Sequence, residues 1–448
     1  MNQSISQEPV KQTEVVVPGI NTSHENSQAN TCIPVQPKSL KEAALDENDV
    51  FRLIIKYLYV RGTHTGRKVS EQVKLPFSIV DDLLFSLRNQ QLIAYRGSSL
   101  GGDYEYELTP KGVEQARQYM GQCTFCGSAP VSLEEYKRSV SRQTLKNLSP
   151  KYNDVKNSLS DLVIEPNVIS QIGQALNGSS CAFIYGAPGN GKSSIASRVI
   201  SAVDPYLWIP RNLVVGGEII RFFDPTVHKE APMPANTGLL SEDDYDQRWV
   251  RIKRPTITVG GELNLNHLEA SLNKTTGIIE APIHLKSNCG CLVVDDFGRQ
   301  RISPAELLNR WIVPLEAKHD YICLPSGRQI QVPFDQLLIF ATNLTPKKIV
   351  DEAFLRRIPY KIQVFDPTDE QFRLLFQRRC QTHSIPYEDR GVDYLLEKYY
   401  RPTNRPLRFS HVEDIIRQMV DFCDFHDQPK VMNKQTIDMA ANNFFSNI

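Results

Sequence analysis

The residues best suited to chemistry lie in the segment 186–194, which reads G-x-x-x-x-G-K-S-S and follows an apolar run ending at Tyr185. Its glycines allow the backbone to curl so that successive N–H groups point at phosphate oxygens. The helix expected after the loop adds partial positive charge at its start. Lys192 can reach the β- and γ-phosphates, and the Ser193 hydroxyl can bind magnesium. We therefore expect a nucleoside triphosphate to be held by Gly186, Ala187, Pro188, Gly189, Asn190, Gly191, Lys192, Ser193 and Ser194.

Two further polar groups follow apolar runs that predict buried strands. Asp295 and Asp296 come directly after the run 291–294, and Asn343 follows the run 337–342. At a strand end beside a phosphate loop, Asp295 can hold magnesium through water, and Asp296 can orient and deprotonate the attacking water. Asn343 can position that water. The plainer alternatives are an acidic turn and a turn-forming asparagine.

The order of phosphate loop, Val-Asp-Asp strand and Ala-Thr-Asn strand resembles the AAA+ ATPases, from about residue 159 to the C-terminus. The resemblance implies ATP and magnesium as ligands and a ring of identical subunits, a hexamer. The sequence F-L-R-R-I at 354–358 is similar to the arginine-finger region of that superfamily. By position Arg357 is the finger that reaches a neighbour's γ-phosphate, with Arg356 as the alternative; a solvated arginine pair is the plainer reading. Arg408 is the candidate sensing arginine of the lid.

More narrowly, the chain resembles the predicted chaperone-type ATPases associated with Flp pilus assembly, in the MoxR-like branch. The stretches that carry this are 254–263, 280–282, 295–300 and a hairpin at 321–332. The implied function is remodelling or assembly of a protein client. Two positions depart from the superfamily pattern: Asp296 stands where glutamate is usual, and Glu413 stands near the lid position where many relatives have arginine. A nucleotide switch or scaffold with little hydrolysis, and a DNA-acting ATPase, remain as alternatives.

Hydrophobic periodicity divides the chain into expected domains. Residues 1–40 are polar and predict a disordered tail. Residues 41–120 predict three helices, a β-hairpin and a closing helix, an order that resembles a winged-helix domain. Residues 121–160 predict a linker with a short helix near 133–140. The resemblance to AAA+ ATPases implies that 161–366 form an α/β nucleotide-binding domain with a doubly wound parallel sheet of the P-loop AAA+ type, and that 367–448 form a helical lid.

The third helix of the expected winged-helix domain offers Asp81 and Asp82 against a single Arg88. Carboxylates on a recognition helix repel the DNA backbone. We therefore expect this domain to bind protein rather than DNA.

The overall composition is neutral, with 51 lysines and arginines against 51 aspartates and glutamates. Such a balance gives no general attraction to nucleic acid or membrane. No apolar run predicts a membrane span or a secretory signal. Nine scattered cysteines favour a reducing, cytoplasmic compartment. Cys123-x-x-Cys126 and Cys289-x-Cys291 could together form a zinc site, as a minor alternative.

Overall fold

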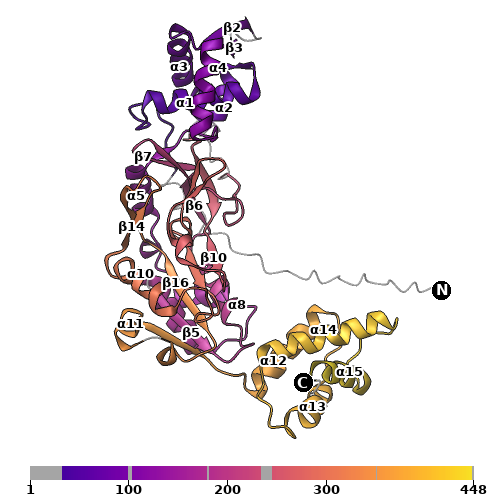
Figure 1. Ribbon diagram of the computed structural model, residues 1–448. Helices are drawn as coiled ribbons and strands as arrows, with labels where there is room; N and C mark the ends of the chain where they lie inside the picture. The colour runs from indigo at the N-terminus through magenta and orange to yellow at the C-terminus, as the bar shows by residue number, and fades with distance from the viewer. Residues whose placement is uncertain (1–32, 99–102, 179–180, 234–244, 350, 446–448) are drawn as a thin grey trace, which may run out of the picture.

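A computed structural model describes residues 33–98, 103–178, 181–233, 245–349 and 351–445. Figure 1 shows an elongated molecule with the N-terminal helices at one end, β-structure in the middle and the C-terminal helices at the other end. Most of the tail expected over residues 1–40 lies outside the described residues. Its last part does not: Val35 forms an isolated bridge with Tyr245, and Ala43 just beyond is fully buried.

The N-terminal part contains helices packed around a small antiparallel sheet of order β1-β3-β2. The helices are α1 (Glu47–Arg61), α2 (Gly66–Val73), α3 (Phe77–Asn89) and α4 (Pro110–Gln122), and the strands are β1 (His64–Thr65), β2 (Ile93–Ser98) and β3 (Tyr104–Leu108). Apolar residues spaced three and four apart on α1 and α3, such as Leu53 and Leu84, are buried in one core. The order of helices and hairpin follows the sequence pattern, and the winged-helix assignment stays a prediction.

The segment 121–160, expected to be a linker with a short helix near 133–140, contains that helix and further elements besides. It contains β4 (Val131–Ser132), α5 (Leu133–Gln143), η2 (Leu145–Asn147) and α6 (Tyr152–Ser158). Tyr136 and Val140 are buried in one core and Leu145 and Val155 in another. The expected helix is α5. The other elements are short and rich in polar residues, so their few apolar positions form too weak a period to detect.

A five-stranded parallel sheet, of order β10-β13-β16-β5-β17, forms the centre of the molecule. Its strands are β5 (Cys181–Gly186), β10 (Thr256–Val259), β13 (Cys291–Val294), β16 (Leu337–Thr342) and β17 (Tyr360–Val364). Alternate residues along each strand face opposite sides. Ile184 and Val293 enter a core with α7 (Pro166–Asn177) and α8 (Lys192–Arg198), which continues as η3 (Val199–Ala202). Phe183 and Phe340 enter a second core with α10 (Pro304–Ala317). Helices therefore cover both faces, and the predicted α/β fold with a parallel sheet is confirmed.

A second, mixed sheet lies between the N-terminal helices and the parallel sheet, in the order β11-β12-β8-β7-β4. Its further strands are β7 (Asn212–Val215), β8 (Glu218–Arg221), β11 (Ser271–Asn273) and β12 (Ile278–Glu280), and β6 (Tyr206–Pro210) pairs with β9 (Trp249–Lys253) nearby. The predicted hairpin is present as β14 (His319–Cys323) and β15 (Gln329–Pro333). It shares a core with this sheet through Ile322 and Ile330. Short elements complete the region: η5 (Leu265–Leu268), α9 (Ile283–Lys286), η6 (Pro346–Lys348) and α11 (Glu352–Arg357).

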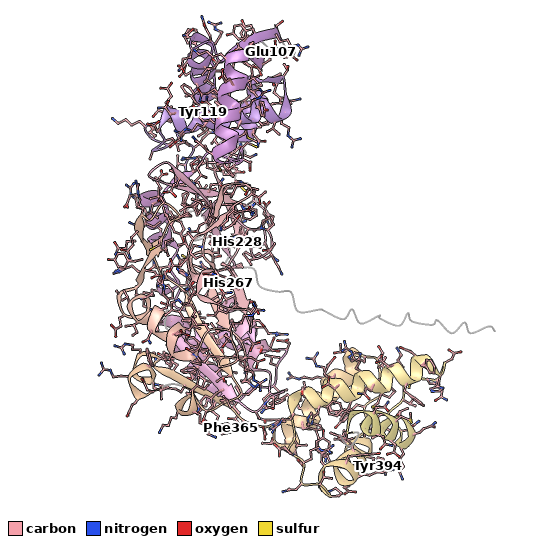
Figure 2. The ribbon with its side chains drawn as sticks, viewed as in Figure 1. Glu107, Tyr119, His228, His267, Phe365 and Tyr394 are labelled. Atoms are coloured by element: carbon pink, nitrogen blue, oxygen red, sulfur yellow. The ribbon has the colours of Figure 1, made fainter. Side chains whose placement is uncertain are left out.

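The C-terminal helices form their own core, built around Phe372, Leu395 and Ile416. They are α12 (Asp369–Thr382), α13 (Asp389–Leu395), the π-helix η7 (Leu396–Tyr400), α14 (Phe409–Phe425) and α15 (Lys434–Phe444). Figure 2 labels Phe365 at the point where the chain leaves the central part for these helices. Within the described residues, none of the helices combines the length and apolar character needed to cross a bilayer.

Candidate nucleotide-binding site

The predicted phosphate loop joins the end of β5 to the start of α8. Gly186 has φ of 153°, and a Cβ at this position would overlap the main-chain carbonyl of Val364 on the neighbouring strand β17. Gly191, with φ of 78°, is the N-cap of α8. The glycines therefore take the positive φ angles that a curled loop needs, and the loop ends at the start of α8.

The order of strands brings three predicted residues into one hydrogen-bonded row. Because β16 lies between β5 and β13, its terminal Asn343 falls between the phosphate loop and the two aspartates. Lys192 Nζ donates to Asn343 Oδ1 at 2.7 Å and to the carbonyl of Ala187 at 2.9 Å. Asn343 Nδ2 donates to Asp296 Oδ1 at 3.2 Å. Strand register thus assembles Lys192, Asn343 and Asp296 at the carboxyl edge of the sheet.

The amine of Lys192 is suited to an anionic ligand. The residue is only 7% exposed, and both of its hydrogen-bond acceptors are neutral oxygens. Burial lowers the pKa of Lys192, while the nearby charges of Asp295 and Asp296 oppose that shift. A phosphate placed beside the amine would compensate the desolvation of its charge.

The two aspartates lie on a tight turn that follows β13. Asp296 has φ of 47°, and its N–H donates to Oδ1 of Asp295 at 2.9 Å. Gln300 Nε2 donates to the carbonyl of Asp295 at 2.7 Å, and Gln300 Oε1 accepts from the N–H of Gly298 at 2.8 Å. A non-glycine residue in this backbone region persists only where its surroundings fix it. Gln300 thus supports the turn, a role that the sequence pattern did not indicate.

A cavity of about 710 Å³ contains this site. The loop from Pro188 to Ser194 lines it together with Asp295, Asp296 and Asn343. Apolar side chains also line it, from Leu162, Val163, Ile164, Val168, Leu375 and Phe409, and these are interspersed with Glu165, Gln371, Arg379 and Glu413. A volume of this size, with anion-binding groups and apolar side chains in one lining, suits a nucleotide.

The residues predicted to bind magnesium fit that ion chemically. Ser193 and Asp295 both line the cavity and offer a hydroxyl and a carboxylate. Magnesium prefers a few protein oxygens completed by phosphate oxygens and water. In the described part of the chain, no group of three or more His, Cys, Asp or Glu side chains could hold a metal. The zinc alternative gains no support, and Cys291 is buried in β13, where burial raises the pKa of its thiol.

Three predicted arginines do not line the cavity. Arg357 ends α11 and donates from Nε to Glu316 Oε1 at 2.6 Å, while the neighbouring Arg356 is exposed. Arg408 is the N-cap of α14 and pairs with Asp366. The structure therefore assembles the predicted residues of the loop and the strand ends. Arg356 and Arg357 do not line the cavity, whereas Arg408, although not a lining residue, lies close to the loop: a Cβ on Gly189 would be 3.6 Å from its Cβ.

Sequence reasoning missed two groups, Arg379 in the cavity lining and Asp366 beside the loop. Arg379 on α12 and Glu413 on α14 both line it, with Arg379 Nε 3.2 Å from Glu413 Oε2. Asp366 lies just after β17, and its Oδ1 accepts from Asn190 Nδ2 at 2.7 Å. The rule that parallel strands end at one edge could have identified Asp366, because β17 pairs directly with β5. Nothing in the sequence pattern indicated Arg379.

Comparisons with known proteins give limited information on family. The model of a domain of unknown function (DUF8689) matches residues 368–443, within the C-terminal helices. No curated protein matches the chain. Solved structures similar to it include the Thermotoga maritima RuvB Holliday junction branch migration motor, with 11% identity, a TM-score of 0.35, and coverage of 62% of this chain and 68% of that one.

A variant of Thermotoga maritima RuvB has 10% identity, a TM-score of 0.36, and coverage of 68% of this chain and 73% of that one. A likeness with so low a TM-score carries no argument about fold or activity. The functional argument therefore depends on the cavity and its side chains.

Proposed function

We propose that this protein is an AAA+ ATPase that binds ATP with magnesium and hydrolyses it. The observation that carries the proposal is the hydrogen-bonded row of Lys192, Asn343 and Asp296 beside a glycine-rich loop. A buried cation, a neutral amide and a carboxylate in this order match the needs of phosphoryl transfer, where positioning and charge stabilisation supply most of the catalysis.

Each residue has a separate part in the proposed reaction. The loop N–H groups and Lys192 hold the β- and γ-phosphates, and Ser193 and Asp295 hold magnesium, which would neutralise charge on the phosphates. Asp296 accepts the proton of the attacking water, and Asn343 orients that water through its amide. Aspartate is one methylene shorter than the usual glutamate, so we expect slow turnover.

We further propose that the active form is a ring, a hexamer, in which Arg357 of one subunit completes the site of its neighbour. Two features support a contribution in trans: Arg357 lies outside its own cavity, and it ends a short helix, α11. Arg357 pairs with Glu316, which is 55% exposed, so another anion could compete for the guanidinium.

The narrower proposal is a MoxR-like, chaperone-type ATPase that remodels a protein client in the cytoplasm. The β14–β15 hairpin directly before β16 supports it. The winged-helix domain proposed for the N-terminal helices would dock protein, since Asp81 and Asp82 are exposed on α3. A nucleotide switch with little hydrolysis is the second candidate, and Asp296 in place of glutamate favours it.

The deciding experiment measures ATP turnover per subunit as the concentration of the full chain is raised, with magnesium saturating. A specific rate that climbs with concentration supports a site completed by a neighbouring subunit. Tight ATP binding with no turnover at any concentration supports the switch. Failure to bind ATP at all refutes the proposal.

A further inference from the structure

A single carboxylate oxygen connects the phosphate loop to the C-terminal helices. Oδ1 of Asp366 accepts a hydrogen bond from Asn190 Nδ2 at 2.7 Å and also pairs with the guanidinium of Arg408. Asn190 belongs to the loop, and Arg408 begins α14. Asp366 lies between β17 and α12, next to the labelled Phe365 in Figure 2. One side chain thus contacts both parts of the protein that surround the cavity.

The start of α14 lies directly against the loop. The N–H of Ser410 donates to the carbonyl of Gly189 at 2.8 Å. A Cβ on Gly189 would overlap Ser410 Oγ and would lie 3.6 Å from Cβ of Arg408. The charge of Arg408 therefore lies beside the part of the loop that would hold phosphates, and it contributes to the lowered pKa of Lys192.

Arg408 is engaged by Asp366 in this conformation. The side chain of Arg408 is 18% exposed and that of Asp366 is 43% exposed, so the pair is only partly shielded from water. A nucleotide in the loop would offer the guanidinium a second anion, and guanidinium binds phosphate oxygens in a two-pronged geometry. ATP carries a γ-phosphate that ADP lacks, so ATP competes for Arg408 more strongly.

We propose that Asp366 is a positioning residue that withholds Arg408 from the bound nucleotide and thereby reduces the preference for ATP over ADP. The inference rests on the proposed function, because it requires a nucleotide in the loop. When the γ-phosphate takes Arg408, the bridge from Asn190 through Asp366 to α14 opens. Asp366 thus couples the identity of the nucleotide to the position of the C-terminal helices.

The test uses Asp366→Asn in the full chain. Asparagine keeps an oxygen that can accept from Asn190, and it removes the negative charge that holds Arg408. Dissociation constants for ATP and ADP are measured by calorimetry. A partly exposed ion pair contributes up to about 1 kcal/mol, so the affinity ratio of ATP to ADP should rise about three- to fivefold.

Two further variants make the result specific. Arg408→Gln should bring the affinities for ATP and ADP closer together. In a double variant that also carries Asp366→Asn, it should abolish the rise in the ratio of ATP to ADP affinity. Asp393→Asn is the matched control, since Asp393 pairs with Arg373 at 2.6 Å in the same group of helices and does not line the cavity. It should leave both constants unchanged.

The inference is overturned if Asp366→Asn changes the affinities for ATP and ADP by the same factor, or if the gain survives in the double variant. If Asp366→Asn does not fold, Arg408→Gln alone decides: an unchanged ratio of affinities refutes the inference. An intact chain that binds neither nucleotide, with Lys192→Ala making no difference, instead refutes the proposed function.

Discussion

Lys192→Ala should weaken ATP binding strongly while leaving the fold almost as stable as before. The amine donates to Ala187 and Asn343, both neutral acceptors, and burial disfavours its charge. Losing two such hydrogen bonds is partly offset by relief of that desolvation, so we expect a change within about 1 kcal/mol.

The effect on nucleotide binding is larger because the amine would donate to a charged oxygen. A hydrogen bond to a charged group contributes about 1.5–3 kcal/mol, which is about 10- to 100-fold in the dissociation constant. At ATP a hundredfold above the dissociation constant of the unmodified chain, ligand binding stabilises the fold by about 2.7 kcal/mol. At the same ATP concentration, the variant would keep only about 0.4–1.4 kcal/mol of that stabilisation.

The assay is chemical unfolding with and without magnesium-ATP, supported by direct calorimetry. Lys56→Ala is the control, because Lys56 is also buried, at 4% exposure, and donates to the carbonyl of Cys123 at 3.2 Å in the N-terminal helices. It should alter stability without altering the stabilisation gained on adding ATP. If Lys192→Ala gained as much stabilisation from ATP as the unmodified chain does, the amine would not contact the nucleotide.

Three further predictions concern turnover and pH. Asp296→Asn should keep ATP affinity and slow hydrolysis at least about 100-fold, since it removes the general base; unaffected turnover would exclude that role. Arg357→Ala should be inactive alone and recover activity when mixed with Asp296→Asn subunits, because the latter still supply Arg357 to intact sites. No recovery at any mixing ratio would argue against a finger in trans. Burial and the charges of Arg408 and Arg405 lower the pKa of His411 from 6.5 to about 4. The unfolded chain therefore binds a proton at His411 more readily than the folded protein does. The free energy of unfolding should fall by about 1–3 kcal/mol as pH is lowered from about 6.5 to about 4. His411→Gln should reduce this loss when unfolding is measured as a function of pH. Equal pH dependence in both proteins would contradict this.

The core half of the site could be predicted because its geometry follows from local rules. A phosphate loop between an apolar strand and a helix has one common arrangement, and polar residues at the ends of parallel strands meet at one edge. Lys192, Asn343 and Asp296 therefore meet as the sequence suggested. The function of each remains a prediction that the variants above test.

In the segment 121–160 the helix near 133–140 could be predicted, but the packing of the segment could not. Its elements pair with partners far along the chain: Val131 with Leu213 in a parallel bridge, and Gln143 with the main chain of Trp208 at 2.7 Å. Such contacts depend on the register of distant strands, which short polar helices do not reveal. Tertiary packing therefore overrides a composition typical of a linker.

The C-terminal helices show why the role of an arginine is harder to predict than that of an acid at the end of a strand. A long cationic side chain can turn toward any nearby anion, and this chain supplies its own: Asp366 for Arg408 and Glu413 for Arg379. Lys192, Asn343 and Asp296 are joined by hydrogen bonds to one another, whereas these two arginines are paired with acids of the chain. Under the proposed function, phosphates would have to displace those acids before the C-terminal helices could attract them. The loop and the strand ends would therefore set the chemistry, and the C-terminal helices would set the response to the nucleotide bound.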